Sequence, residues 1–314
     1  MTVNSDVAEM PTIPVICGPT ASGKTSLALE LAEEYPVEIV SADSRQIIKY
    51  LDIGTAKPTE DEKNKVTFHL INIIEPGARY SAFQFISDAN RAIEDILNRG
   101  KWPLIVGGTG LYIRALTEGV VEIDNDDMVI RETLEKEMEK IGLEKMHEKL
   151  SNIDPLEAAR VHPQNKKRVI RALEIFYLTG KTKSELLVTG AYQKSCYNFQ
   201  YFCLTPDRKV LYDIINERVD KMLAEGLVEE VIRLFNRGLK EKVRKANVIG
   251  YNEIIDYLES KRKLEEAVLL IKQNTRRYAK RQMTWFRRQE GCKYFSDLED
   301  MKKALKDLLK NNNT

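Results

Sequence analysis

Short apolar runs alternate with helical patterns along the first 120 residues. The runs at 11–17, 37–43 and 102–108 are apolar or β-branched, and each ends at a glycine or a polar residue. Helical stretches lie between them: one covers about 24–35, and another opens at a Ser81–Gln84 capping box and ends at Gly100. Apolar strands separated by helices predict a parallel sheet covered on both faces. Ligands of such sheets bind beyond the carboxyl ends of the strands.

The pattern becomes helical after Gly119. Residues 122–154 hold eleven acidic and five basic residues without a convincing strand, and residues 160–171 are basic. We predict a mainly helical insertion domain over 119–199, with residues 198–206 forming a strand that returns to the sheet. The expected α/β core therefore comprises residues 1–118 and 200–314, and its last part is helical, with a long helix over about 264–290.

Composition narrows the class of protein. The chain has 314 residues, 43% hydrophobic and 31% charged, with a net charge of +1, which excludes a disordered chain. The sequence holds no apolar run of the ~18–20 residues that a membrane span needs, and its first residues lack the apolar core of a signal peptide. The four cysteines and three histidines show no metal-ligand spacing. We expect a reduced, cytoplasmic, monomeric protein that lacks a structural metal and does not bind membranes.

The long C-terminal helix has a basic half and an apolar half. At 100° per residue, its cationic side chains gather on one half of the wheel: Arg276, Arg277, Lys280, Arg281, Arg287 and Arg288. This stripe is either a solvated helix face or, with the second basic patch at 166–171, a surface for a large polyanion.

A phosphate-binding loop follows the first strand. The sequence G-x-x-x-x-G-K-[ST] is present as Gly18, Pro19, Thr20, Ala21, Ser22, Gly23, Lys24 and Thr25, between a predicted strand and a predicted helix. Its backbone amides and Lys24 can bind a di- or triphosphate, and Thr25 can ligate Mg²⁺.

Asp43 and Thr109 follow the other two strands. Asp43 is a candidate general base, a candidate magnesium ligand, or a solvated residue that caps the amides of Arg45 and Gln46. The glycines around Thr109, in residues 107–112, allow either a ligand or a tight turn. No acidic residue follows this strand, which counts against simple ATP hydrolysis.

These motifs occur together in one family. The sequence resembles the tRNA dimethylallyltransferases in GPTASGKT (18–25), SADSRQ (41–46), DIGTAKPT (52–59), GGTGLYIRAL (107–116) and KRQMTWFR (280–287). Residues 154–165, 168–175, 180–186, 218–223 and the stretch near 250 match as well. The matches keep their order over about 270 residues, and DIGTAKP with GGTGLY is far more specific than the phosphate loop alone.

The resemblance implies a P-loop NTPase-like sheet and a prenyl transfer. In that family the donor is dimethylallyl diphosphate, held in the phosphate loop, and the acceptor is N6 of the adenosine at position 37 in the anticodon stem-loop of tRNA. The resemblance implies that Asp43 is the general base, that Thr109 lies at the reacting centre and that Arg218 contacts the diphosphate. It also implies Mg²⁺ as cofactor. Contacts to tRNA are implied for Asp43, Ser44, Arg45, Gln46, Thr109, Arg131, Lys167, Arg168, Val169, Ile170, Arg171, Asn247, Val248, Ile249, Gly250, Tyr251, Asn252, Lys280, Arg281, Gln282, Met283, Thr284, Trp285, Phe286 and Arg287.

Two positions depart from the family pattern, and two other functions compete. Ile48 occupies the place of a tyrosine and Phe68 that of a histidine, which bears on the pocket wall or the tRNA edge. A small-molecule kinase or ATPase would use Asp43 as base or metal ligand, although it leaves the basic helix unexplained. An RNA-binding protein without catalysis would leave the Asp43 and Thr109 pair unexplained.

Overall fold

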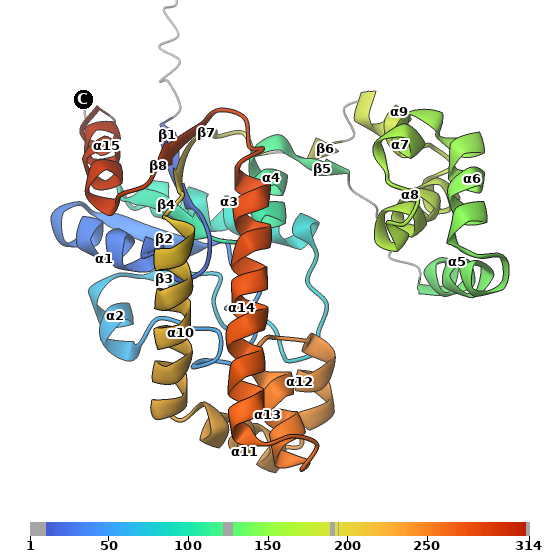
Figure 1. The fold of residues 1–314 in the computed structure, drawn as a ribbon. Helices are drawn as coiled ribbons and strands as arrows, with labels where there is room; N and C mark the ends of the chain where they lie inside the picture. Colours follow the sequence, from blue (N-terminus) through green and yellow to red (C-terminus); the bar gives the residue numbers. More distant parts are fainter. Residues whose placement is uncertain (1–10, 122–127, 189–191, 194, 312–314) are drawn as a thin grey trace, which may run out of the picture. The chain divides into compact units, whose positions relative to one another are not determined.

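The computed structural model describes residues 11–121, 128–188, 192–193 and 195–311. Its contacts divide the chain into two compact units, Met1–Glu118 with Ser195–Thr314, and Gly119–Lys194 (Figure 1). The expected boundary at 199/200 thus falls five residues later than the division in the structure. The first residues and the start of the acidic stretch, 122–127, lie outside the described ranges.

A six-stranded parallel sheet forms the larger unit. Its order is β3-β2-β4-β1-β7-β8, and every pair of neighbours runs parallel. The strands are β1 (Thr12–Cys17), β2 (Val37–Ser41), β3 (Phe68–His69), β4 (Trp102–Gly107), β7 (Asn198–Leu204) and β8 (Cys292–Phe295). The predicted α/β class is confirmed, as is the return of the strand after residue 198 to the edge of β1.

Helices cover both faces of this sheet. On one face, α1 (Lys24–Glu34) and α15 (Leu298–Asn311) pack against alternate strand residues such as Ile16, Leu104 and Phe202. Side chains alternate along a strand, and the intervening residues Val15 and Ile105 are also buried. The helices α3 (Ala82–Asn98) and α4 (Gly110–Glu118) lie on that second side, with α3 contacting β2 and β4.

A group of helices extends the larger unit beyond the carboxyl ends of the strands. The two longest, α10 (Arg208–Ala224) and α14 (Leu264–Phe286), pack side by side (Figure 1). Three shorter helices join their far ends: α11 (Leu227–Asn236), α12 (Lys240–Ala246) and α13 (Tyr251–Leu258). The remaining helix, α2 (Glu60–Lys65), opens with a Thr59–Glu62 capping box. Within the described ranges, no helix is long and apolar enough to cross a membrane.

The smaller unit is mainly helical. It contains α5 (Met128–Ile141), α6 (Leu143–Ile153), α7 (Pro155–Arg160), α8 (Lys166–Thr179) and α9 (Lys183–Val188). Leu134, Met146, Leu150 and Leu173 belong to its buried core. Two short antiparallel strands, β5 (Val120–Val121) and β6 (Tyr192–Gln193), pair at its ends. Both strands lie outside residues 122–154, the stretch expected to hold no strand, and the described part of that stretch contains only the helices α5 and α6.

Two further sequence expectations need correction. The chain after residue 207 is not wholly helical, because β8 pairs with β7 at the edge of the sheet. Only four residues form β8, and they follow a helix whose basic pattern dominates the local sequence. The long helix ends at Phe286 instead of about residue 290, and a glycine with φ of 67°, Gly291, separates it from β8.

A buried carboxylate links the outer strands to the end of α3. Glu38 on β2 is 1% exposed. It accepts bonds at 2.7 Å each from Arg99 Nη2 and Lys101 Nζ, and pairs at 2.7 Å with His69 Nε2. The bond from Arg99 is the main cause that holds the pKa of Glu38 far below its usual range, assisted by Lys101 and His69. His69 thus has a structural role.

Candidate functional site

The phosphate-binding loop lies between β1 and α1, as the sequence predicts. Gly18, Ala21 and Gly23 adopt positive φ angles of 143°, 63° and 87°. A Cβ on Gly18 would lie 2.9 Å from the carbonyl oxygen of Leu204, so this position requires glycine. Lys24 Nζ bonds the loop's own Pro19 oxygen at 2.5 Å. The loop therefore holds its lysine folded inward, where an anionic ligand would meet it.

Asp43 lies just beyond the end of β2. Its Oδ1 accepts the backbone N–H groups of Arg45 at 2.8 Å and Gln46 at 3.4 Å. These two bonds leave Oδ2 of the same carboxylate outside the turn. The capping interpretation thus explains the contacts of Oδ1. The same two bonds fix the orientation of the carboxylate, and so the direction from which Oδ2 can accept a proton.

Thr109 is bound to the segment that carries Asp43. Its Oγ1 accepts from the backbone N–H of Ser44 at 2.9 Å, and its own N–H donates to the Ala42 oxygen at 3.1 Å. Gly107 lies so close to β2 that a Cβ there would be 2.2 Å from the Ala42 oxygen. The glycine loop and the Asp43 loop therefore form one rigid edge.

Gln282 on α14 joins this edge to the phosphate-binding loop. Its Oε1 accepts the N–H of Thr20 at 2.9 Å, and its Nε2 donates to the Gly108 oxygen at 2.8 Å. A Cβ on Gly108 would lie 2.3 Å from Gln282 Nε2, and one on Gly110 would lie 2.2 Å from Trp285 Nε1. The glycines after β4 thus admit side chains of α14, a close approach that neither sequence interpretation of this loop contained.

Two cations face Asp43. Burial lowers the pKa of Lys24 to about 8, an effect that Asp43 opposes and Arg218 strengthens. Burial also lowers the pKa of Arg218 on α10, again against the attraction of Asp43. Lys24, Asp43 and Arg218 are therefore close enough to interact electrostatically, although residues 24 and 218 lie far apart in the sequence.

A cavity of about 360 Å³ opens at two of these groups, Asp43 and Arg218. It is bounded by the phosphate loop, the end of β2, the helices α10 and α14, and the segment between α12 and α13. Its lining comprises Thr20, Asp43, Arg45, Gly54, Thr55, Ile215, Arg218, Val219, Met222, Asn247, Val248, Ile249, Gly250, Asn252, Glu253, Ile271, Asn274, Thr275, Tyr278 and Arg281. Charged groups and an apolar wall thus share one cavity in the larger unit.

The sequence of the chain identifies its family. Residues 46–289 match the family described as IPP transferase, and residues 11–72 match the family described as isopentenyl transferase. The first match spans well over half of the chain. The chain belongs to the IPP transferase family.

Relatives of known name and structure agree. A protein of Geobacter metallireducens named tRNA dimethylallyltransferase is 48% identical over 89% of this chain and 91% of its own length. Its namesake in Thermotoga maritima is 45% identical over 96% and 98%. The crystal structure of the tRNA isopentenylpyrophosphate transferase of Bacillus halodurans is 39% identical, with a TM-score of 0.67, over 96% of this chain and 98% of that one. A eukaryotic dimethylallyltransferase crystallised while acting on tRNA gives 30% identity and a TM-score of 0.76 over 88% and 70%. The resemblance found in the sequence is confirmed.

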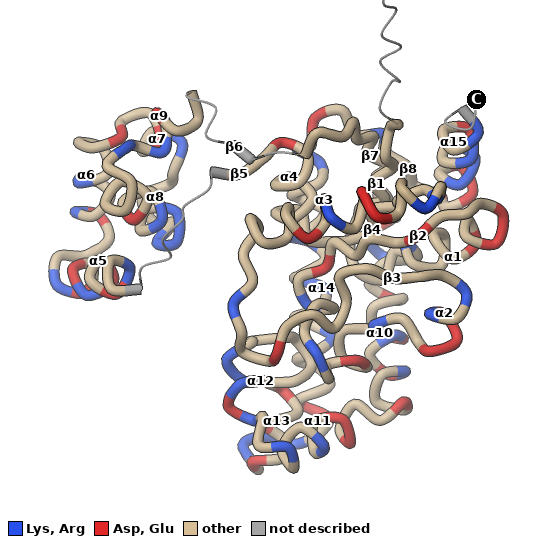
Figure 2. The backbone as a smooth tube through the Cα atoms, turned by 180° about the vertical axis from the view of Figure 1, so that it is seen from behind, with Lys and Arg blue, Asp and Glu red and all other residues tan. Residues whose placement is uncertain are grey.

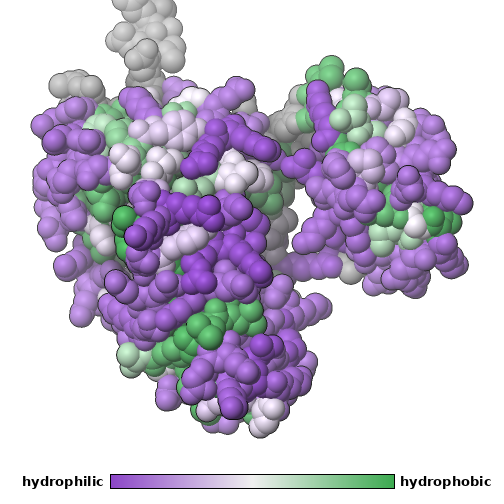
Figure 3. Space-filling view, in the orientation of Figure 1, coloured by the Kyte–Doolittle hydropathy of each residue, from purple (hydrophilic) through white to green (hydrophobic). Residues whose placement is uncertain are grey.

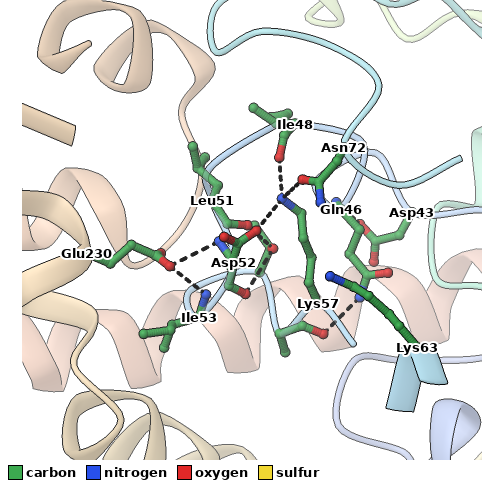
Figure 4. A network of polar contacts seen from close by, with 12 residues as sticks. Asp43, Gln46, Ile48, Leu51, Asp52, Ile53, Lys57, Lys63, Asn72 and Glu230 are labelled. Atoms are coloured by element: carbon green, nitrogen blue, oxygen red, sulfur yellow. Dashed lines mark hydrogen bonds and ion pairs between the residues drawn. The ribbon is translucent and has the colours of Figure 1, made fainter. Parts of the chain in front are cut away.

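In this IPP transferase a network of polar contacts supports one wall of the cavity (Figure 4). The buried ammonium of Lys57 donates to Ile48 O at 2.5 Å, Asp52 Oδ1 at 2.8 Å and Asn72 Oδ1 at 2.6 Å. Lys57 belongs to the DIGTAKP motif, so a motif recognised by resemblance has a structural task.

Glu230 of α11 completes the support of this wall. It accepts the N–H groups of Asp52 at 3.1 Å and Ile53 at 2.9 Å, and the hydroxyl of Tyr251 at 2.5 Å. The ring of Tyr251 lies against Gly54, where a Cβ would be 2.5 Å away. Sequence reasoning missed Glu230, because nothing in its helical pattern separates it from a solvated acid.

The three stretches assigned to tRNA alternate between exposed and buried residues. Val169, Ile170, Val248, Tyr251, Gln282, Met283 and Phe286 are buried. Lys167, Arg168, Arg171, Lys280, Arg281, Thr284 and Arg287 are exposed. The buried residues of these stretches therefore offer no side chain to a partner, and only the exposed and half-buried ones can do so.

The basic stripe on α14 is accessible. Arg277, Lys280 and Arg281 are exposed and, with Thr284, line a second, shallow depression. Within the described ranges, no carboxylate forms an ion pair with them. In Figure 3 the surface over the upper part of this helix is hydrophilic, and a hydrophobic patch lies further down. Arg276, by contrast, is half-buried and donates to Asn216 Oδ1 at 2.5 Å.

The smaller unit has its own basic surface at the start of α8, where Lys and Arg cluster along the chain (Figure 2). Lys167 and Arg168 are exposed. Arg171 pairs with the buried Glu174 at 2.9 Å, and Arg131 pairs with Glu135 at 3.6 Å. Two of these cations are thus partly neutralised within the unit.

Proposed function

We propose that this chain transfers the dimethylallyl group of dimethylallyl diphosphate to N6 of the adenosine at position 37 of tRNA and releases diphosphate. The proposal depends on one observation: Asp43, Arg218 and Thr20 of the phosphate loop line one cavity that also has an apolar wall. Membership of the IPP transferase family and the names of its relatives support it.

The phosphate loop and Arg218 would bind the diphosphate of the donor. Lys24, Arg218 and the inward amides of the loop offer positive charge where the leaving group gains negative charge. On α10, Ile215 and Met222 are three and four residues from Arg218 and lie on the same helix face. Val219 lines the same cavity as these residues. They would hold the five-carbon group beside the bond that breaks.

Asp43 would act as general base. An exocyclic amine is a poor nucleophile, because its lone pair is delocalised into the purine ring. As the bond between N6 and C1 of the donor forms, the bond from C1 to the diphosphate oxygen breaks, and a carboxylate takes the N6 proton. Oδ1 of Asp43 is held by two amides, so Oδ2 is the oxygen available for this step. Thr109 would position the Asp43 loop through its bond to Ser44 and contact the acceptor.

Mg²⁺ fits the donor set of this site. The hydroxyl of Thr25 lies in the first turn of α1, beside the phosphate loop, and Mg²⁺ prefers such oxygen ligands together with substrate phosphates. We infer that Thr25 would hold the ion, which would neutralise charge on the departing diphosphate.

The tRNA would bind across exposed basic residues. We assign Lys280, Arg281 and Arg287 on α14, and Lys167 and Arg168 on α8, to contacts with its phosphates. The target base must leave its stack to enter the cavity, which costs a few kcal/mol. The amides of Asn247, Asn252 and Asn274 line the cavity where that base would be read.

We propose that the protein is a monomer that meets its tRNA in the cytoplasm. One copy of the chain brings Asp43, Arg218 and Thr20 of the phosphate loop to one cavity, which supports the proposal. Light scattering with and without tRNA measures the first part, and a stable dimer as the only active species contradicts it.

The test is prenyl transfer by an Asp43→Asn variant. Asparagine keeps an oxygen for the two amides but cannot take a proton, so we expect the rate of transfer from labelled dimethylallyl diphosphate to fall by about 10²–10⁴-fold. Affinity for tRNA and donor should change little. The matched control is Asp61→Asn, which alters an exposed carboxylate of α2.

Three outcomes contradict the proposal. Wild-type turnover of ATP without prenyl transfer identifies a kinase or ATPase. Salt-sensitive binding of tRNA without any turnover identifies an RNA-binding protein. Full prenyl transfer by Asp43→Asn shows that Asp43 is not the general base and that another group takes the proton.

A further inference from the structure

Three cysteines meet in the sheet beside the phosphate-binding loop. Cys17 on β1 and Cys203 on β7 are register partners, and Cys292 on β8 pairs with Tyr201, two residues before Cys203. Side chains alternate along a strand, so all three point to the same face. Their Sγ atoms all lie within 4.8 Å of one another. The spacing of the cysteines in the sequence gives no sign of this cluster, because its members come from three strands that are far apart along the chain.

The sulfur positions suit one metal ion. Zinc–sulfur bonds are about 2.3 Å long, which places two thiolates on a tetrahedral ion about 3.8 Å apart. The three sulfurs therefore need to close by about 1 Å at most, which side-chain rotation can supply. Cys17 and Cys203 are buried, and Cys292 is half-buried, so the cluster is shielded and has one accessible edge.

A disulfide uses the cluster less well. β7 lies between β1 and β8, which separates the backbones of Cys17 and Cys292 by two strand spacings, about 9–10 Å. A disulfide requires Cα atoms within about 7 Å. Only a pair that includes Cys203 can be bridged, and the third thiol is then left over. A single ion engages all three.

We propose that Cys17, Cys203 and Cys292 form a three-thiolate site for one soft metal cation. Thiolates select soft ions such as Cu⁺ and Zn²⁺. In the described part of the chain no fourth His, Cys, Asp or Glu joins the cluster, whereas structural zinc sites hold four ligands. The set thus favours Cu⁺, or Zn²⁺ with water as fourth ligand at the Cys292 edge. Binding releases the three thiol protons to solvent.

The site would connect the edge of the sheet to the phosphate loop. Cys17 immediately precedes Gly18, and Cys203 precedes Leu204, against which Gly18 packs. An ion held there would fasten β8, and with it the end of α14, to the strand from which the loop departs. Stability of this region should therefore depend on the metal.

The test uses Cd²⁺, a soft ion whose bonds to thiolates absorb in the ultraviolet. The reduced, metal-free full chain is titrated without oxygen, and its reactive thiols are counted before and after. Cys17 and Cys203 are buried, so protection is measured at Cys292. We expect saturation at one Cd²⁺ per chain, protection of Cys292 but not of the exposed Cys196, and a higher unfolding temperature. Cu⁺ and Zn²⁺ should displace the Cd²⁺ in competition.

Single variants assign the ligands. Cys292→Ser alters the most accessible member, and Cys203→Ala a buried one. Each should weaken Cd²⁺ binding by more than about 100-fold, since even residues that only orient metal ligands contribute 10–100-fold. Cys196→Ser, at the exposed fourth cysteine, should bind like the wild type. Circular dichroism of the metal-free variants verifies their fold.

Two results overturn the proposal. One is Cd²⁺ binding that survives in both Cys292→Ser and Cys203→Ala. The other is a reduced wild-type chain whose titration with Cd²⁺ gives no absorption from Cd²⁺–thiolate bonds. This result overturns the proposal also where a separate sample, left in air, forms a disulfide to Cys203. Prenyl transfer is not needed for any of these measurements, so the proposed function and this site are tested separately.

Discussion

Replacing Gln282 separates a structural role in the site from a direct contact with RNA. This side chain lies in the KRQMTWFR stretch assigned to tRNA by resemblance, yet it is 5% exposed and bonded at both ends within the protein. Gln282→Met keeps the length of the side chain and removes both of its hydrogen bonds.

The cost follows from the groups that remain. The carbonyl of Gly108 would have no partner in a buried place, which costs about 1–3 kcal/mol. The N–H of Thr20 would lose its partner in a part-buried place beside the cavity, which costs less because water can reach it. We expect the free energy of unfolding to fall by about 1–4 kcal/mol. The phosphate loop would no longer be linked to the glycine loop, so the KM for dimethylallyl diphosphate should rise.

Urea unfolding followed by circular dichroism measures the stability, and steady-state prenyl transfer measures the KM. The matched control is Gln273→Met, an exposed glutamine on the same helix, for which neither value should move. If Gln282→Met unfolds like the wild type but binds tRNA more weakly, the side chain acts on RNA and has no structural role in the site.

Three other predictions concern acid stability, the cavity wall and the basic stripe. The pKa of Glu38 is depressed in the folded protein, so its stabilising effect is present above the unfolded pKa near 4.5 and is lost as pH falls below it. Glu38→Gln should therefore reduce the loss of stability at acid pH, and an unchanged loss contradicts this. Glu230→Gln keeps only one carbonyl oxygen for three donors and should lower the free energy of unfolding by about 1–3 kcal/mol together with kcat, as urea unfolding and prenyl transfer will show. Lys280→Gln with Arg287→Gln should make the salt dependence of tRNA binding shallower, by about 0.7–0.9 in the logarithmic slope for each phosphate that the variant leaves unneutralised, whereas Lys303→Gln on α15 should not. Equal slopes in all variants would place the RNA elsewhere.

The core of the fold could be predicted from the sequence because its signals are local. The strands at 12–17, 37–41 and 102–107 are mostly apolar or β-branched, and their ends carry the glycines and Asp43. The edge strands β3 and β8 could not be found in this way. They contain two and four residues, and pairing with a neighbour, which no local pattern records, makes them strands.

The residues of the site form the same two groups, those that a local pattern reveals and those that depend on distant partners. The phosphate loop and Asp43 stand in short motifs, so their spacing could be recognised. The supporting residues depend on distant partners: Gln282 bonds residues 262 and 174 positions away, and Glu230 bonds a turn 177 positions away. The three cysteines belong to this second group, which is why spacing alone indicated no metal site.

Helix α14 shows how one segment can serve two tasks that resemblance treats as one. On its inner side, Gln282 contacts the phosphate loop and the glycine loop after β4, and Trp285 contacts the glycine loop. Its exposed side presents Arg277, Lys280 and Arg281, which have no acidic partners among the described residues. Because the two sides alternate along the sequence, a continuous motif contains both. Substitutions on the buried side should therefore change stability and donor binding, whereas those on the exposed side should change salt-dependent RNA binding alone. The motif in this helix therefore combines a buried set and an exposed set of positions, and only the three-dimensional arrangement separates the two sets.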